Sequence, residues 1–572
     1  MVSDQWLLLA SWIVVFAVLV GWGAVIRRLW RAPIQADPAD FLLCFWLGWA
    51  AVLVVLQLWH FVWPIDGRAR WLVVAGGLLG LPLLLRPGRR LVRRLPRALP
   101  LLAALAGIGV WLSNRALDGA RFGDAGGYYV PTIRWIIEHP LVIGLANLYP
   151  PYAYNQSYFL YAALLDGGPF AGRAHHLLNG MLLAVLAART LLGLWRASPT
   201  AVDVFYALML PAEAEAAAGY LFTSPAPDFG VYALGIVLSG ELIAVETSAE
   251  GEAGALWRHF LSLALLAAIA PTVKLPIVGL AAAAMLVGTV VWIRRVRRQW
   301  QTMTIGLALA AAFGVLALGP WMAGNILMSG CPLFPSAAMA LDVPWRVNWN
   351  VQRWIANTMI IGDWRLVLHN PGWVAQRFVA MGWTQPNVSV PAGVAVGALV
   401  LGAAAAAIRP LGQSPRIGRR VPIALLLPPL ASLVLCIATT PVPRYAGATL
   451  WLLAAQSVMV ALGGRLPRPA ARRAIVVGAV ALAALPFASG APLWLAMRRF
   501  ATSPHPVVAP RQLASGLVVF VPPSAACWDA ALPCTPQPHA GLRLRRPPDL
   551  GSGFEVEPGT APPQRLGVPG VR

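Results

Sequence analysis

Charged side chains are scarce in this sequence, and that scarcity excludes an ordinary water-soluble protein. Only 12% of the 572 residues are charged, about half the usual share for a soluble domain, while 58% are hydrophobic. Apolar runs near the ~20 residues needed to cross a bilayer recur along the chain. The composition therefore predicts an all-α polytopic membrane protein.

Several nucleotide, metal and redox motifs are absent from the sequence. It has no Walker-type Gly-Lys-Ser/Thr loop, no His-Glu-x-x-His and no Cys-x-x-Cys. An ATP-driven pump is therefore not expected. No internal repeat is apparent either, although paired halves are typical of many transporters.

Hydropathy predicts about fourteen membrane-spanning segments. They lie near residues 5–26, 40–63, 71–86, 98–113, 172–195, 202–222, 229–246, 258–273, 275–293, 302–323, 390–408, 421–439, 445–463 and 474–495. The first segment has no basic stretch before its apolar run, so we interpret it as a retained span and not as a signal peptide.

Positive charge is concentrated between these segments. The formal net charge is +22, and arginine clusters follow alternate predicted spans. The clusters lie at residues 27–31, 86–97, 294–298, 409–420 and 465–473. Because positively charged loops stay in the cytoplasm, the pattern places the N-terminus outside and indicates topology, not a nucleic-acid partner.

This orientation predicts four regions. We expect N-terminal transmembrane helices at 1–113, an outer loop at 114–171 with a candidate active site, a transmembrane bundle at 172–495 that includes an outer loop at 324–389, and a periplasmic tail at 496–572. The tail is rich in proline and reads as a small appendage with a flexible end after about Glu557. The expected location is a bacterial inner membrane.

The chain has only five cysteines. Cys44, Cys331 and Cys436 are isolated and are expected to be small core residues. Cys527 and Cys534 lie in the predicted periplasmic tail, where an oxidising compartment favours a disulfide between them.

The outer loop carries acidic residues directly after an apolar segment. Asp118 and Asp124 lie there, and Gly126-Gly127 after Asp124 would allow a tight turn and the approach of a substrate. Asp124 could accept a proton from an attacking hydroxyl, or hold a divalent cation together with a second acid such as Asp118. A capping or turn role is the alternative interpretation of an Asp at this position.

Aromatic residues follow in the same loop. Pro131–Glu138 predicts an amphipathic juxtamembrane helix, with Trp135 suited to the headgroup region. A second cluster lies beside Asn147 and Asn155 and consists of Tyr149, Tyr152, Tyr154, Tyr158, Phe159 and Tyr161. The cluster fits either an interfacial aromatic belt or the wall of a site for a polar, sugar-like ligand.

Further charges lie at predicted outer helix ends. Asp228 could cap a helix or face the same cavity as Asp124. Lys274 is the only lysine, and its ammonium could bind a lipid phosphate or extend to the interface. Arg444 could grip a phosphate with two hydrogen bonds.

Two acids lie inside the sixth predicted span. Glu213 and Glu215 are two positions apart and cannot share a helix face. An acid at this depth normally faces protein or a wet cavity, so we expect at least one of them to pair internally.

The chain resembles the GT-C superfamily of integral-membrane glycosyltransferases, which use lipid-phosphate-linked sugars. A closer resemblance, to an uncharacterised bacterial branch with a Cys-Trp-Asp…Cys tail, spans most of the chain. It rests on Asp124…Tyr128-Tyr129, Ile133-Arg134-Trp135-Ile136, Gly144-Leu145-Ala146-Asn147-Leu148, Asn155-Gln156-Ser157, Ser224-Pro225-Ala226-Pro227-Asp228, Thr272-Val273-Lys274-Leu275, Asn325-Ile326-Leu327-Met328-Ser329-Gly330, Pro443-Arg444-Tyr445 and Cys527…Cys534.

The resemblance implies a GT-C-like helical bundle and an inverting glycosyltransferase. Asp124 would be the catalytic base. From their own positions and chemistry, we expect the substrate-binding residues to be Asp118, Tyr128, Tyr129, Asn147, Asn155, Asp228, Lys274 and Arg444. An Ala-Gly-Gly insert separates Asp124 from the tyrosines, and no motif places a second acid, so a divalent cation remains open as a cofactor.

The expected partners are a lipid-linked sugar donor, membrane lipids and an envelope glycan, lipid or protein as acceptor. A transporter or flippase of a lipid-linked glycan is the main alternative, because it would share an aromatic outer cavity and buried acids. An envelope scaffold is a third interpretation.

Overall fold

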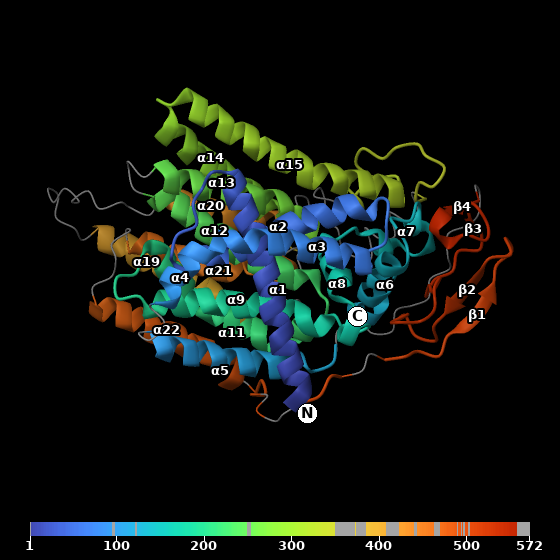
Figure 1. Cartoon of the computed structure of the whole chain (residues 1–572), viewed down its shortest axis with the longest axis horizontal. Helices are drawn as coiled ribbons and strands as arrows, with labels where there is room; N and C mark the ends of the chain where they lie inside the picture. The colour runs from blue at the N-terminus through green and yellow to red at the C-terminus, as the bar shows by residue number, and fades with distance from the viewer. Residues whose placement is uncertain are drawn as a thin grey trace.

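The structure is a computed structural model. It describes residues 2–93, 98–120, 123–248, 253–348, 372, 385–407, 422–439, 443–462, 469–488, 490–493, 495, 498–501 and 504–557. Most helices lie side by side and form a bundle, and the C-terminal tail lies against one end of it (Figure 1). We call this end the tail end.

The bundle contains the long helices and several shorter ones. They are α1 (Val2–Leu29), α2 (Pro38–His60), α3 (Gly67–Gly80), α4 (Leu85–Val92), α5 (Leu99–Ala116), α9 (His175–Trp195), α10 (Ala201–Leu208), α11 (Leu210–Ala218), α12 (Pro227–Thr247), α13 (Ala253–Val273), α14 (Val278–Val296), α15 (Trp300–Ser329), α19 (Pro386–Ala407), α20 (Leu427–Thr439), α21 (Thr449–Ala461) and α22 (Pro469–Ala488).

Among the described residues, ten helices are long and apolar enough to cross a membrane, and three shorter apolar helices accompany them. The predicted span at 202–222 is wrong as a single helix. These residues form α10 and α11, which are separated at Met209, and then a 3₁₀ turn at Tyr220–Thr223. Pro211 explains the break, because it lacks an amide proton and its ring clashes with the carbonyl four residues earlier.

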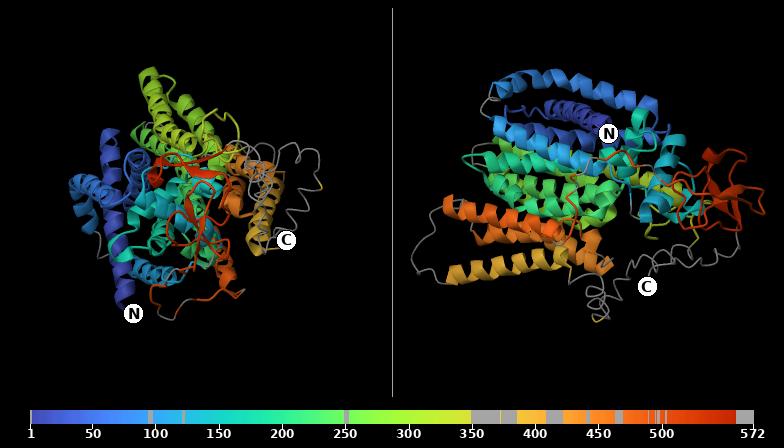
Figure 2. Two further views of the ribbon diagram at one scale, coloured as in Figure 1. Left: turned by 90° about the vertical axis from the view of Figure 1, so that its right-hand side faces the viewer. Right: turned by 90° about the horizontal axis from the view of Figure 1, so that it is seen from below.

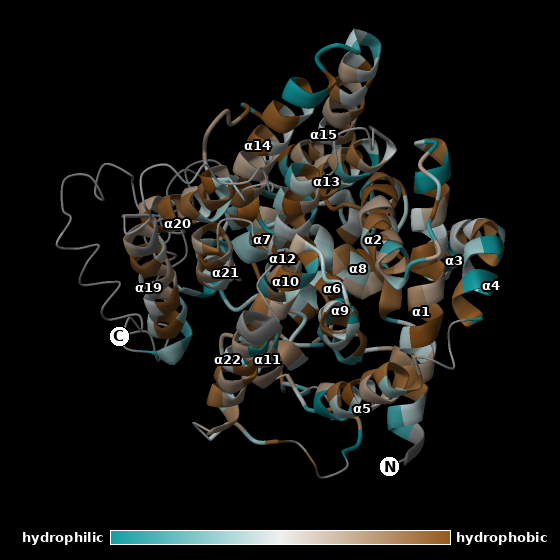
Figure 3. Cartoon of the chain, turned by 90° about the vertical axis from the view of Figure 1, so that its left-hand side faces the viewer, coloured by the Kyte–Doolittle hydropathy of each residue, from teal (hydrophilic) through white to brown (hydrophobic). Residues whose placement is uncertain are grey.

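The outermost helices are apolar and yet little covered by protein. Only 11% of the most apolar stretch of Trp300–Ser329 and 17% of that of Pro386–Ala404 is buried. Seen from the end opposite the tail, hydrophobic residues predominate on the outer helix α19, while hydrophilic residues gather on α4 and near the visible ends of α14 and α15 (Figure 3). Apolar surface of this extent needs lipid around it. The chain is therefore an all-α, multi-pass membrane protein, as predicted.

Close packing of small residues joins the first two helices. α1 runs obliquely across the bundle and packs on α2 and α3 (Figures 1 and 3). A Cβ atom added to Gly48 of α2 would overlap the carbonyl oxygen of Leu19 in α1. Small residues at such crossings let membrane helices approach closely.

The first outer loop forms a compact layer at the tail end. Its helices are α6 (Val130–Glu138), α7 (Leu145–Leu148) and α8 (Ser157–Leu165), with short 3₁₀ turns at Pro150–Ala153 and Gly168–Phe170. The predicted helix at Pro131–Glu138 is thus present as α6. Trp135 is only 2% exposed, however, and packs on Phe554 of the tail, so its predicted headgroup position is wrong.

The tail adds two small antiparallel hairpins. β1 (Ala509–Gln512) pairs with β2 (Val518–Val521), and β3 (Leu542–Leu544) pairs with β4 (Phe554–Val556). Both views in Figure 2 place the tail against the outer-loop layer. The Phe554 amide donates to the Ile143 carbonyl at 2.9 Å, so the tail is docked on this layer and is not a separate appendage. The predicted flexible end after Glu557 lies outside the described residues.

The crossing of α1 and α2 gives a first prediction. Gly48→Ala should destabilise the protein by about 1–3 kcal/mol, the usual cost of overpacking, because its methyl group would meet the α1 backbone. Thermal unfolding of the purified protein in detergent measures the change. Gly107→Ala in α5 is the control, since a Cβ there would meet nothing within 4 Å. Equal melting of the two variants would contradict the predicted clash.

Candidate functional site

The candidate site begins at a turn in the first outer loop. Asp124 immediately precedes a π-helical turn, Ala125–Tyr129, which continues into α6. Such turns interrupt a regular helix and are frequent at functional sites. The side chain of Asp124 remains one-third exposed, while Tyr128 and Tyr129 behind it are buried.

Asp228 enters the site from the start of α12. Pro227 occupies the first turn of this helix, where a missing amide proton costs little, and Asp228 follows it. A carboxylate in the first helical turn is stabilised by the helix dipole. Its side chain is nevertheless almost fully buried, at 3% exposed, so it also needs a cationic partner.

Lys274 lies at the break between α13 and α14. α13 ends at Val273, and Lys274 has an extended backbone with φ −162°. Pro276 has no amide proton, and its ring would clash with the carbonyl of the residue four positions earlier in a continuous helix, which helps to explain why the two helices do not continue into one another. Because the backbone at Lys274 is extended and not helical, the side chain can point into the protein.

Arg444 comes from a 3₁₀ turn, Pro443–Ala446, between α20 and α21. Its guanidinium donates to the hydroxyl of the adjacent Tyr445 at 3.0 Å and lies over the same ring. The side chain is 25% exposed. Arg444 therefore combines a fixed orientation with access to solvent or to a ligand.

The structure brings these four charged residues into one group, which we call the ion-pair cluster. Arg444 Nη1 lies 3.2 Å from Asp124 Oδ2, and Lys274 Nζ lies 2.7 Å from Asp228 Oδ1. Tyr445 joins the two pairs, since the Lys274 ammonium lies 4.5 Å from the centre of its ring.

Tyr129 connects the turn after Asp124 to the second pair. Its hydroxyl donates to Asp228 Oδ2 at 3.5 Å. Tyr128 stacks edge-on against Tyr129 and lies behind it. The two tyrosines are therefore placed beside the cluster, as their position in the sequence suggested, with Tyr129 in direct contact.

The surroundings alter the acidity of Asp124. Burial raises the pKa of its carboxyl above the ordinary value of 3.8, and the nearby cations Arg444 and Lys274 act in the opposite direction. A raised pKa strengthens a carboxylate as a proton acceptor. Asp124 thus combines partial exposure with a raised pKa.

A cavity opens beside the cluster. It has a volume of about 900 Å³ and lies between the tail-end parts of α11, α12, α19, α21 and α22. Arg444 and Asp228 line it together with Tyr220, and much of the remaining wall is apolar, including Leu450 and Leu482. The cavity therefore offers a charged end and a hydrophobic wall to the same ligand.

Neutral hydrogen bonds hold the segments that carry the cluster. Asn179 of α9 donates to the carbonyls of Leu221 and Ser224, at 2.8 and 2.7 Å, and so fixes the loop that leads to Asp228. Ser157 of α8 pairs with Thr272 at 2.9 Å, beside Lys274. Sequence reasoning missed Asn179, because nothing marks it as different from other polar residues in membrane helices.

Asp118 does not join the ion-pair cluster. One of its carboxylate oxygens lies 2.7 Å from Arg498 Nη1, and the other lies 3.6 Å from Arg115 Nη1. The described part of the chain contains no group of three or more His, Cys, Asp or Glu side chains that could hold a metal ion. The predicted pairing of Asp118 with Asp124 around a cation has no geometric support.

Asn147 and Asn155 also lie apart from the cluster. Asn147 donates to the backbone carbonyls of Trp345 and Phe554, at 2.9 and 3.4 Å. Asn155 and Trp321 each donate a side-chain N–H to the other's carbonyl at 2.9 Å. The two amides thus connect the outer loop to the tail and to α15.

The tyrosine cluster forms neither of the predicted surfaces. Tyr152, Tyr154, Tyr158 and Tyr161 are each at most 8% exposed and pack within the outer-loop layer. The cavity beside Tyr152 has a volume of only about 30 Å³, roughly the space of one water molecule. These aromatic residues are therefore a packed core, and not a lipid belt or a ligand wall.

Glu213 and Glu215 point in different directions, as their spacing required. Glu213 accepts a hydrogen bond from Thr190 of α9 at 2.6 Å and is buried. Glu215 accepts one from Trp451 of α21 at 2.6 Å and lines the cavity. The expected internal pairing is thus confirmed for Glu213.

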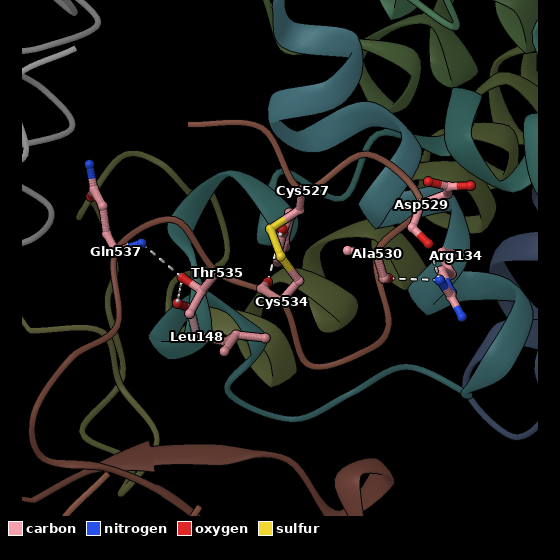
Figure 4. Close-up of a disulfide and its surroundings, with 9 residues drawn as sticks. Arg134, Leu148, Cys527, Asp529, Ala530, Cys534, Thr535 and Gln537 are labelled. Atoms are coloured by element: carbon pink, nitrogen blue, oxygen red, sulfur yellow. Dashed lines mark hydrogen bonds between the residues drawn. A yellow bond between two sulfur atoms is a disulfide. The ribbon is translucent and has the colours of Figure 1, made fainter. Parts of the chain in front are cut away.

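Cys527 and Cys534 form a disulfide, as predicted, while Cys44, Cys331 and Cys436 are buried in the bundle and the loop that follows α15, as small core residues would be. The disulfide closes a short loop of the tail that lies beside Arg134 and Leu148 of the outer loop (Figure 4). The tail therefore contacts the segment that carries Asp124, which the sequence did not reveal.

Comparison with protein families assigns the chain to one of them. Residues 6–446 match the model named Domain of unknown function (DUF8201), which covers more than half of the chain, so the protein belongs to this family. The matched range includes all four residues of the ion-pair cluster. No curated protein and no solved structure matches the chain.

The Lys274–Asp228 pair generates a prediction about stability. Lys274→Met leaves a buried carboxylate without its cation, which should cost about 3–5 kcal/mol. Adding Asp228→Asn removes the unpaired charge and should recover part of that loss. Thermal unfolding in detergent, monitored by tryptophan fluorescence, measures both changes.

The matched control is Arg68→Met. Arg68 pairs with Asp66 at the surface and is 59% exposed, so its loss should cost no more than ~1 kcal/mol. If Lys274→Met melted like Arg68→Met, or if the double variant were the less stable of the two, the buried pair would not have the importance that its geometry implies.

Proposed function

We propose that the protein is an inverting glycosyltransferase that moves a sugar from a polyprenyl-phosphate donor to a cell-envelope acceptor. The reaction would take place at the outer face of a bacterial inner membrane, on the side of the periplasmic tail. The resemblance to GT-C enzymes supports this reaction class, and the ion-pair cluster beside the cavity supports its chemistry.

The cavity is the observation that carries the proposal. A lipid-linked sugar has a long apolar chain, a phosphate and a polar sugar, and it needs a site that matches all three. The cavity offers an apolar wall, and Arg444 lines it 3.2 Å from Asp124. The phosphate would bind at Arg444, the chain along the wall, and the sugar beside Asp124.

Within this site the residues have different tasks. Asp124 takes the proton from an acceptor hydroxyl, whose oxygen attacks the anomeric carbon from the face opposite the phosphate. The bond to the phosphate oxygen breaks, and the phosphate leaves with the electron pair. Arg444 stabilises the growing negative charge with a guanidinium that can form two parallel hydrogen bonds.

Lys274 supports this arrangement from a buried position. Its ammonium is occupied by Asp228 and by the face of Tyr445, so Arg444 is the cation of the cluster that contacts the donor. Lys274 keeps Asp228 neutralised, and Asp228 in turn holds the Tyr129 hydroxyl.

The base itself gives the direct test of the proposal. Asp124→Asn keeps the size of the side chain but removes the proton acceptor, so transfer should fall by roughly two to four orders of magnitude. The assay uses purified protein in lipid nanodiscs, a polyprenyl-phosphate sugar and membrane extract as the source of acceptor. Thermal unfolding should change little, because the Asp124 side chain is partly exposed.

Glu138→Gln is the matched control, since Glu138 is a carboxylate of the same loop and is 39% exposed. It should retain full transfer. Full activity of Asp124→Asn would remove Asp124 as the base. Exchange of lipid-linked sugar between leaflets by the wild type, without a new glycosidic bond, would favour the transporter interpretation instead.

The acidity of Asp124 gives a pH prediction. The active form is the deprotonated carboxylate, so kcat/KM should fall as the pH drops through the raised pKa of Asp124. Arg444 lowers that pKa, and Arg444→Gln should therefore move the acid limb to higher pH. Arg498→Gln, which removes a partner of Asp118 instead, should leave the limb in place.

The pH dependence of kcat/KM for the two variants and the wild type checks this. If the acidic side of the kcat/KM profile stayed at the same pH in Arg444→Gln, or moved to lower pH, a group other than Asp124 would control the fall in activity.

A further inference from the structure

The disulfide loop of the tail, residues 527–534, lies directly on the turn that follows Asp124. The Trp528 amide donates to the Gly126 carbonyl at 2.9 Å. The indole of Trp528 covers the same glycine so closely that a Cβ on Gly126 would overlap the ring. Gly126 thus makes room for a tail residue, and not for a substrate as the sequence suggested.

Further contacts bind the part of this loop that follows Trp528 to the outer-loop layer. The Arg134 guanidinium of α6 donates to the carbonyls of Asp529 and Ala530 (Figure 4). The Tyr152 hydroxyl donates to the Cys534 carbonyl at 3.1 Å. Both contacts are made by residues that follow the tyrosines adjoining the ion-pair cluster, while Gly126 precedes these tyrosines.

Thr535 adds a contact just beyond the disulfide. Its side chain is fully buried, and its hydroxyl donates to the Leu148 carbonyl at 3.0 Å. Figure 4 shows Thr535 and Leu148 on one side of the disulfide and Arg134 with Ala530 on the other. The loop is therefore held at Trp528, in its middle by Arg134 and at its C-terminal end.

The backbone of Trp528 is itself unusual. Its φ is +45°, in the left-handed region that bulky residues rarely adopt. Such a conformation persists only where the surroundings hold it in place. The disulfide restricts the short loop, and the contacts of Trp528 and Arg134 fix it on the turn.

We infer that Trp528 is a positioning residue for Asp124, and that the Cys527–Cys534 bond keeps Trp528 in place. A π-helical turn is a rare departure from the regular α-helix, and a contact from outside the turn can favour it. Trp528 supplies that contact at Gly126, two positions from Asp124. Without it, the turn is free to rearrange and the carboxylate leaves its position opposite Arg444.

Hydrogen–deuterium exchange of the full chain in nanodiscs tests the inference without any assay of activity. Trp528→Ala should speed exchange in residues 123–138, while α9 and α12 exchange as in the wild type. Trp528→Phe, which keeps an aromatic ring over Gly126, should restore most of the protection. The double variant Cys527→Ser/Cys534→Ser should also speed exchange in 123–138.

Arg543→Ala is the matched control, because Arg543 lies in β3 of the tail and pairs only at the surface with Glu555. It should exchange like the wild type in 123–138. Unchanged exchange in Trp528→Ala, or an equal effect of Arg543→Ala, would overturn the inference. If Trp528→Ala also sped exchange in α9 and α12, the Cys527→Ser/Cys534→Ser variant would decide. Exchange at the wild-type rate in residues 123–138 of that variant would also overturn the inference.

A second measurement rests on the proposed function. In the transfer assay, Trp528→Ala should lower kcat at least tenfold and leave KM for the donor within twofold, because Arg444 and the cavity are intact. A rise in KM as large as the fall in kcat would contradict a role for Trp528 that is confined to Asp124. If the wild type showed no transfer, the proposed function would be refuted. The positioning role of Trp528 would still be tested, because the hydrogen-exchange experiment does not depend on activity.

Discussion

The need to neutralise buried charge organises the tail end of this protein. A chain with so few charged residues places Asp228 and Lys274, both less than 10% exposed, in direct contact. An isolated charge in such surroundings would cost several kcal/mol, so neither residue is tolerable without the other. This requirement brings the start of α12 to the break between α13 and α14, and Tyr445 attaches the Pro443–Ala446 turn to the same point.

Proline and small residues make that convergence possible. Pro227 starts α12 and Pro276 limits the continuation of α13. The side chains of Asp228 and Lys274 therefore lie at the ends of helices and not in their middles. Gly126 lets the tail approach the turn after Asp124. The site is thus built from interruptions of regular helices, and prolines mark two of these interruptions in the sequence.

The sequence predicts the membrane class, most of the spans and the identity of the four charged residues, because hydropathy and isolated charges in apolar surroundings are local signals. It does not predict that Tyr152 and Tyr158 are core, since an aromatic residue suits a belt, a ligand wall and a core equally well. Pro211 was a signal in the sequence that residues 202–222 do not form one continuous helix. The docking of Trp528 on Gly126 joins residues 402 positions apart, and no local pattern encodes such a contact.

The charge balance of the ion-pair cluster has a consequence for binding. Two carboxylates face two cations, so the cluster is formally neutral and does not attract an anion by net charge alone. In the proposed reaction an anionic donor would compete with Asp124 for Arg444, and the apolar wall of the cavity would supply binding energy for that exchange. If Arg444 turned to the donor, Asp124 would lose a cation that lowers its pKa. Under this proposal, binding of the anionic group and activation of the carboxylate would be coupled through one guanidinium.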